Sequence, residues 1–202
     1  MAALYERAGH DPTKICGVTT LDVVRANKFV HEETGAPIER IQVPVVGGHA
    51  GHFTSASALP LFSQDRYARR IPEPRRTELI QRVQSGSTEV SDAKKGKGTA
   101  TLSQAYAAWR FGHAVLSGLA GKRTQEFCFL KSNACPGLDY FASKVTFGPG
   151  GVEKVHPLGK LSPEESKILD EVKGLLAEDI KCGLEYANST ELGLGSPKAS
   201  AA

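Results

Sequence analysis

The pattern of apolar and polar positions along the chain predicts a mixture of strands and helices. The clearest strand signal is an apolar run, Ile41, Val43, Val45 and Val46, which ends at two glycines. Such a run is typical of a buried strand, and glycine lets the backbone turn at its end. His49 follows the two glycines, so we expect this imidazole at the end of a rigid element and within reach of a ligand.

Other segments complete the predicted sheet. Residues 126–130 and 141–147 and a stretch near Val152 are rich in residues that favour strands. Residues 148–151 are Gly-Pro-Gly-Gly, which predicts a hairpin turn before Val152. The sequence therefore predicts a small and mostly antiparallel sheet.

Helical spacing of apolar residues predicts the elements that cover this sheet. The main helices are expected to begin near Thr20, Thr77, Thr101 and Ser162. Residues 90–95 predict a further short helix, and residues 1–9 are typical of a helix end that Gly9 closes. The fold class expected is α+β, with long helices on a small antiparallel sheet and no parallel doubly wound sheet.

The last helix has the strongest start signal. Ser162 can cap it, Pro163 suits its first position, and Glu165 completes a capping box. We expect this helix to end near Tyr186. The small polar residues 188–202 are then expected to form a flexible tail after a single domain of residues 1–187.

The helix that begins near Thr101 carries the longest apolar stripe of the middle region. A stripe of large apolar side chains at helical spacing usually faces the core. We therefore expect the following side chains to be buried: Leu102, Tyr106, Trp109, Val115 and Leu116.

Composition narrows the class of protein. Of 202 residues, 40% are hydrophobic and 23% charged, which favours a packed core over disorder. The net charge of +3 is too small to indicate a nucleic-acid or membrane partner, and the apolar runs are too short to span a membrane. Four cysteines without a CxxC pair or a secretory signal indicate reduced thiols in a soluble, intracellular protein.

Three residues are candidates for acid–base chemistry and carboxylate binding. His49 can transfer protons near neutral pH, although a single histidine after Gly-Gly is more often structural. Asp22 and Arg25 lie three apart and share one face of a helix. They form either a surface ion pair or a functional set, in which Asp22 orients a histidine and Arg25 binds a carboxylate.

The sequence does not contain the motifs of several other kinds of functional site. No GxGxxG follows a predicted strand, and neither GxxxxGK[ST] nor GxSxG occurs, so the chain shows no dinucleotide fingerprint, phosphate loop or nucleophile elbow. His49 and His52 could bind a metal, but no further ligands are spaced to complete a site.

Three stretches resemble NAD-dependent malate dehydrogenases. They are Gly17-Val-Thr-Thr-Leu-Asp22-Val-Val-Arg25-Ala-Asn27, Val43-Pro-Val-Val-Gly-Gly-His49-Ala-Gly51 and Leu59-Pro-Leu-Phe-Ser-Gln64. The resemblance continues to about residue 187. It is closest to the branch found in mitochondria, glycosomes and many bacteria. The resemblance does not distinguish a mitochondrial, a glycosomal and a cytosolic location.

The resemblance implies roles for single residues. His49 matches the histidine that takes the hydroxyl proton of malate as hydride leaves for NAD. Asp22 matches its partner aspartate, and Arg25 matches an arginine that binds a substrate carboxylate. Gln104 stands where the family usually has a methionine near the nicotinamide. The family also implies malate and oxaloacetate as substrates and a homodimer.

The resemblance covers only the C-terminal, substrate-binding half of these enzymes. The N-terminal Rossmann domain, which holds most of the NAD site, has no counterpart in this sequence, and about four extra residues follow His52. We expect a malate dehydrogenase half whose activity needs the other half. The alternatives are a catalytically silent chain that associates with full-length subunits, and a partial sequence of a complete enzyme.

Overall fold

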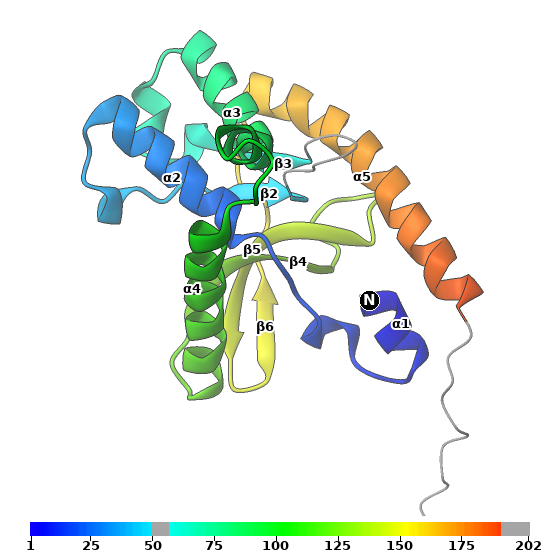
Figure 1. Cartoon of the computed structure of the whole chain (residues 1–202). Coiled ribbons are helices and arrows are strands. Elements are labelled where there is room, and N and C mark those ends of the chain that lie inside the picture. The colour runs from blue at the N-terminus through cyan, green and yellow to red at the C-terminus, as the bar shows by residue number, and fades with distance from the viewer. Residues whose placement is uncertain (50–56, 191–202) are drawn as a thin grey trace, which may run out of the picture.

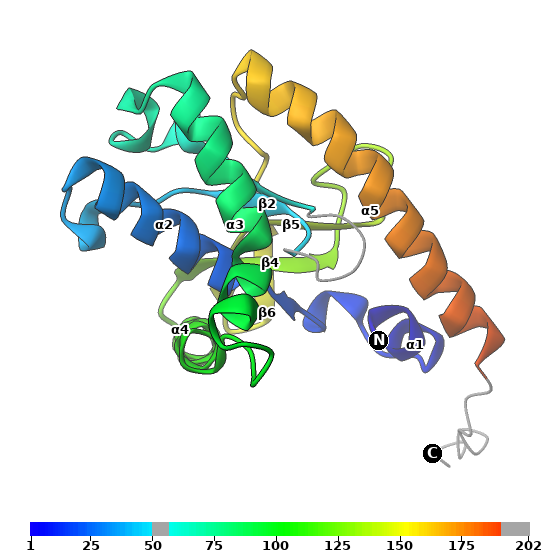
Figure 2. The ribbon, with the colours of Figure 1, turned by 45° about the horizontal axis from the view of Figure 1, so that its top comes forward.

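The structure is a computed structural model that describes residues 1–49 and 57–190. An antiparallel sheet lies at its centre, with α5 along one side and α2, α3 and α4 on the other (Figures 1 and 2). The helices are α1 (Ala2–Arg7), α2 (Thr20–Thr34), α3 (Glu73–Ala93), α4 (Thr101–Leu119) and α5 (Pro163–Ser189), with short 3-10 turns at Pro12–Lys14, Ile38–Arg40, Phe62–Gln64 and Ala68–Arg70. The strands are β1 (Gly17–Val18), β2 (Val45–Gly47), β3 (Ala58–Pro60), β4 (Thr124–Lys131), β5 (Tyr140–Gly148) and β6 (Gly151–Val155).

The sheet has the order β1-β4-β5-β2-β3, and β6 pairs with β5 beside this path. Every strand pair among the described residues is antiparallel, which confirms the α+β prediction. β5 and β6 form the predicted hairpin around residues 148–151. β2 is shorter than expected, because the apolar run adopts strand pairing only from Val45 on.

The core explains why β2 is apolar at successive positions. Val45 faces a cluster with Val23 of α2 and Val83 of α3, whereas Val46 faces a second cluster that includes Leu169 and Leu176 of α5. The strand is therefore buried on both faces, as expected of a continuous apolar run. This strand carries the backbone to His49.

Helix α4 packs in a way that the sequence pattern did not predict. Leu102, Trp109 and Leu116 are 86%, 62% and 67% exposed, and Tyr106 is also exposed, so the prediction that these four side chains are buried is wrong. Val115, the fifth member of the expected stripe, is partly buried against the core. The buried face of α4 instead carries Ala107, Ala114 and Gly118. Small side chains let the helix approach β5 closely. The face of α4 that is buried is therefore the face with the smallest side chains.

Helix α3 also differs from its prediction. It is one continuous helix to Ala93, so residues 90–95 do not form a separate element. Its glycine, Gly86, is buried and accommodates the side chain of Arg25, whose Cδ and Nε would lie 3.0 Å from an added Cβ. A tertiary contact therefore explains the presence of glycine in the middle of this helix.

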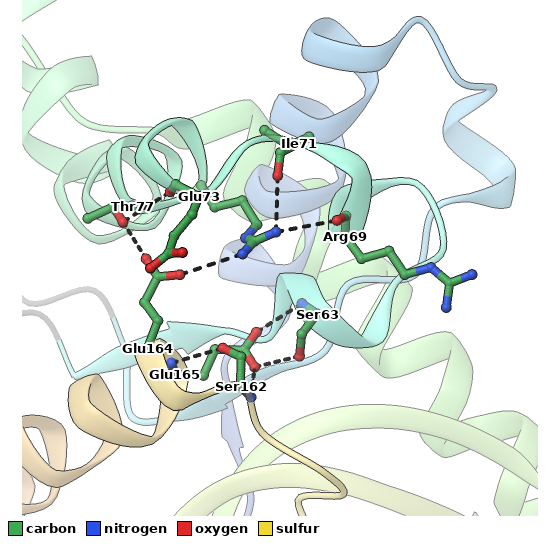
Figure 3. A network of polar contacts seen from close by, with 9 residues as sticks. Ser63, Arg69, Ile71, Glu73, Thr77, Ser162, Glu164 and Glu165 are labelled. Carbon is green, nitrogen blue, oxygen red and sulfur yellow. Dashed lines mark hydrogen bonds and ion pairs between the residues drawn. The ribbon is translucent and has the colours of Figure 1, made fainter.

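The start of α5 confirms the predicted capping box. Ser162 Oγ accepts a hydrogen bond from the amide of Glu165 at 3.1 Å, and the Glu165 carboxylate accepts from the amide of Ser162 at 2.8 Å. The same carboxylate accepts from the amide and hydroxyl of Ser63, while Glu164 contacts Thr77 of α3 (Figure 3). These contacts dock α5 onto the segment that follows β3. The helix continues to Ser189, a little beyond the expected end at Tyr186.

The chain ends follow the predictions where they are described. Gly9 has a φ of 81°, and its amide donates a hydrogen bond to the carbonyl oxygen of Glu6. The amide of His10 donates to the carbonyl oxygen of Tyr5. These contacts close α1 with the expected glycine cap. The expected tail from residue 191 onward lies outside the described residues. No helix of the described chain is long and apolar enough to cross a membrane.

Candidate active site

His49 stands at the end of β2 because two glycines turn the chain there. Gly47 has φ of 97°, and a Cβ at this position would lie 2.2 Å from the carbonyl oxygen of Ser57. The amide of Gly48 donates to the same oxygen at 2.8 Å. Only glycine suits this close approach, which fixes the direction in which the backbone leaves the sheet.

Helix α2 brings the second group to the same point. It packs on the core through its apolar face, and Gly35, with φ of 66°, ends it in the left-handed conformation. Thr19 occupies its N-cap position, but the Thr19 hydroxyl makes no capping hydrogen bond. Asp22 in the first turn is fully buried. Its carboxylate therefore faces protein groups rather than solvent.

His49 and Asp22 form a direct hydrogen bond. His49 Nδ1 lies 2.7 Å from Asp22 Oδ2. An ionised carboxylate can only accept, so Nδ1 carries the proton and Nε2 of the neutral ring is free to accept one. This hydrogen bond raises the pKa of His49 and the charge of Asp22 adds to it, whereas burial and the charge of Arg25 act in the opposite direction.

Arg25 lies beside this pair and is almost completely buried. Its Nη1 is 3.6 Å from Asp22 Oδ1, and Nη1 and Nη2 both donate to Ser87 Oγ of α3 at 3.2 Å. Burial lowers the pKa of Arg25, while the charges of Asp22 and Glu89 oppose this effect. The two terminal nitrogens form the planar fork that suits a carboxylate, and Ser87 holds this fork from α3.

A cavity of about 570 Å³ opens beside His49. Apolar side chains make up much of its wall, among them Leu176 of α5. Thr19 and Tyr140 also line it, and both are buried with hydroxyl groups that have no hydrogen-bond partner among the described residues. A half-exposed imidazole in a largely apolar cavity suits a small ligand with a polar group.

The structure brings together three of the four residues singled out from the sequence. His49, Asp22 and Arg25 meet, although the first two are 27 positions apart. Gln104 is exposed at the start of α4 and does not line the cavity beside His49. His52 and the extra residues after it lie outside the described part of the chain.

Sequence patterns missed other residues that shape this site. Gly86 and Ser87 hold Arg25, and Thr19 and Tyr140 form part of the cavity wall. None of these residues belongs to a sequence motif. The only usable signal was the helical pattern of residues 73–93, because one continuous helix there includes Ser87. Within residues 1–49 and 57–190, no group of three or more His, Cys, Asp or Glu side chains is arranged to hold a metal ion.

Comparison with known proteins agrees with this architecture. Residues 19–187 match the family described as lactate/malate dehydrogenase, alpha/beta C-terminal domain. The mitochondrial malate dehydrogenase of Saccharomyces cerevisiae is 41% identical over 92% of this chain and 55% of its own length. The mitochondrial enzyme of Citrullus lanatus is 42% identical over 93% of this chain and 53% of its own length. The chain therefore spans about half the length of the curated relatives it matches.

Solved structures show the same fold. Malate dehydrogenase from Salinibacter ruber aligns with a TM-score of 0.75 at 22% identity, over 93% of this chain and 60% of that chain. Lactate dehydrogenase from Cryptosporidium parvum aligns with a TM-score of 0.73 at 22% identity. The fold and site define an α+β domain with a carboxylate-supported histidine beside a buried arginine. The chain belongs to the lactate/malate dehydrogenase family and corresponds to its alpha/beta C-terminal domain.

Proposed function

We propose that this chain supplies the acid–base and carboxylate-binding half of an L-malate dehydrogenase, which interconverts malate and oxaloacetate with NAD. The observation that carries the proposal is the 2.7 Å contact between His49 Nδ1 and the fully buried Asp22. In a dehydrogenase of a 2-hydroxy acid, one group must remove the hydroxyl proton and another must hold the carboxylate. His49 and Arg25 suit these two tasks and lie beside the same carboxylate.

Each residue has one part in the proposed chemistry. Nε2 of neutral His49 accepts the C2 hydroxyl proton of malate, and the Asp22 carboxylate stabilises the imidazolium that forms. The guanidinium of Arg25 binds a malate carboxylate through its two terminal nitrogens, displacing or sharing the hydroxyl of Ser87. In the reverse direction, imidazolium returns the proton to the carbonyl oxygen of oxaloacetate.

The described residues do not by themselves fit NAD. Every strand pair is antiparallel, so no strand–helix–strand unit of the dinucleotide-binding type is present among them, and Gln104 does not line the cavity beside His49. Binding of NAD is therefore assigned to a further domain or subunit, in keeping with the relatives of which this chain spans about half.

Two measurements test the proposal. The first is binding of L-malate to the purified chain, followed through the imidazole resonances of His49 by NMR. We expect malate to shift these resonances, and Arg25→Lys to weaken binding about tenfold or more, because lysine lacks the planar fork. Absence of any shift in the unaltered chain would contradict the proposal.

The second measurement is NADH oxidation with oxaloacetate. The chain is assayed alone and mixed with the separately prepared N-terminal half of the yeast mitochondrial relative. We expect activity only in the mixture, and a loss of about 100-fold to 10,000-fold in His49→Ala, as for removal of a general base. Activity in the mixture that does not depend on His49 would exclude the assigned role.

A second candidate function is association with malate dehydrogenase subunits without catalysis. The exposed stripe on α4 favours it, because Leu102, Trp109 and Leu116 present large apolar side chains to solvent. Size-exclusion chromatography with light scattering tests whether the chain forms a homodimer or co-elutes with the yeast mitochondrial enzyme. Trp109→Glu should abolish either complex, whereas Glu178→Ala, at an exposed position of α5, should not.

A further inference from the structure

Two of the four cysteines lie side by side next to the candidate active site. The ladder between β1 and β4 pairs Gly17 with Phe129 and Val18 with Cys128. Continued by one residue, this register places Cys16 on the same face of the sheet as Cys128, in the diagonal position. Cys16 is partly buried and packs against the apolar cluster that contains Cys128.

The two thiols differ in access. Cys128 is completely buried, whereas Cys16 is partly exposed and lines the cavity beside His49. The other cysteines lie elsewhere. Cys135 is buried in the cluster under α5, and Cys182 is exposed on α5 itself. Cys16 is therefore the more accessible of the two thiols and lies at the wall of the cavity.

The same contact makes the two thiols unequal as nucleophiles. The neighbouring thiol of Cys128 lowers the pKa of Cys16, although burial opposes this effect. The neighbouring thiol of Cys16, burial and the nearby charge of Glu126 all raise the pKa of Cys128. Cys16 is therefore the thiol that ionises first and attacks, and Cys128 is the one that resolves the intermediate.

We propose that Cys16 and Cys128 are a site of reversible oxidation, at which a small-molecule disulfide such as oxidised glutathione converts the neighbouring thiols into an intramolecular disulfide.

The proposed thiol–disulfide exchange proceeds in two steps. The thiolate of Cys16 attacks one sulfur of oxidised glutathione, forms a mixed disulfide and releases one glutathione thiolate. The thiol of Cys128 then loses its proton and attacks Cys16 Sγ, which releases the second glutathione. Two cysteine thiols are oxidised, one glutathione disulfide is reduced to two glutathione molecules, and these take up the two thiol protons.

The local backbone can accommodate the bond. A disulfide needs a shorter separation than diagonal neighbours in a sheet usually have, so one of the two segments must shift. β1 is an edge strand of only two residues, Gly17 and Val18, and Cys16 lies just outside it. The shift therefore falls on the short segment that leads into α2. That segment forms part of the cavity wall beside His49, so the disulfide would alter the candidate site.

Peptide mapping tests the site directly, because trypsin places each cysteine in a different peptide. These peptides are residues 15–25, 124–131, 132–144 and 182–198. The full-length chain is incubated with oxidised glutathione, alkylated without reduction and digested. We expect a cross-linked species of peptides 15–25 and 124–131 that disappears on reduction. Its absence, or cross-links distributed among all four peptides, would overturn the proposal.

Two variants provide the matched comparison. Cys128→Ser should stop the reaction at the mixed disulfide, so that glutathione accumulates on peptide 15–25. Cys182→Ser should leave the cross-link unchanged, since Cys182 is exposed on α5 and does not itself line the cavity. Circular dichroism confirms that each variant is folded. If Cys128→Ser accumulates no glutathione on Cys16, the assigned order of attack is wrong. Because no readout depends on catalysis, this test is independent of the dehydrogenase proposal.

Discussion

His49 Nδ1 lies 2.7 Å from Oδ2 of Asp22, and this carboxylate is completely buried while the imidazole is half-exposed. The buried partner is screened little by solvent, so its effect on the ring is strong. The exposed side of the imidazole lines the cavity. The pair therefore combines a fixed tautomer with access for a ligand, which is what a proton-transfer group requires.

The first prediction concerns the titration of His49. Asp22→Asn removes the charge and weakens the hydrogen bond that raises the pKa of His49, so this pKa should fall. NMR titration of the imidazole resonances measures it. His156 is an internal control, because burial and two nearby lysines lower its pKa and it does not contact Asp22. In the unaltered chain His49 should titrate above His156. The reverse order would contradict the assignment.

The same shift predicts how stability depends on pH. Because the pKa of His49 is higher in the folded chain, the protonated ring favours folding. This stabilisation is complete below the unfolded value of about 6.5 and is lost as pH rises through the folded pKa. Urea unfolding across this range should show the loss in the unaltered chain and a smaller one in Asp22→Asn. An equal pH dependence in both would show that the pair does not contribute.

The second prediction concerns Ser87 as the residue that holds Arg25. Ser87→Ala removes the hydroxyl that both terminal nitrogens of Arg25 contact, so the guanidinium should lose its fixed orientation. We expect weaker malate binding by about tenfold, the equivalent of about 1.4 kcal/mol. Calorimetry measures the affinity. Ser85→Ala on the exposed side of α3 is the control and should bind malate normally. Equal affinities of the two variants would exclude this role for Ser87.

The third prediction concerns the packing of α4. A Cβ at Gly118 would lie 2.6 Å from Cβ and 2.9 Å from the carbonyl carbon of Phe147 in β5. Gly118→Ala should therefore destabilise the chain by about 1–3 kcal/mol, since overpacking outweighs the gain in helix propensity. At Gly112 of the same helix an added Cβ meets nothing within 4 Å, so Gly112→Ala should stabilise by about 0.5–1 kcal/mol. Urea unfolding followed by circular dichroism compares them, and equal stabilities would refute the described packing.

The fourth prediction concerns the attachment of α5. Glu165 is buried and accepts hydrogen bonds from the amides of Ser63, at 2.9 Å, and Ser162, at 2.8 Å (Figure 3). Glu165→Ala leaves these donors without their partner and should cost about 2–4 kcal/mol. Glu178→Ala, on the exposed face of α5, should change stability by less than about 0.5 kcal/mol. Thermal unfolding distinguishes the two, and a small effect at Glu165 would exclude its docking role.

Local chemistry explains what could be predicted from the sequence. The capping box of Ser162 and Glu165, the hairpin at residues 148–151 and the glycine turn before His49 each depend on contacts within a few residues. Motif resemblance added the association of His49, Asp22 and Arg25, which the structure places in contact. It also placed Gln104 near the nicotinamide, and this residue is exposed at the start of α4.

By itself, the sequence determined the type of most elements, the turn that presents His49 and the family to which the chain belongs. Only the tertiary structure decided which face of α4 is buried, that Ser87 holds Arg25, and that Cys16 meets Cys128. The reason is physical. Hydrophobic spacing shows that a helix has an apolar face, but close packing on β5 selected Ala107, Ala114 and Gly118 over the larger side chains. Contacts between residues far apart in the chain follow from such packing and leave no local pattern.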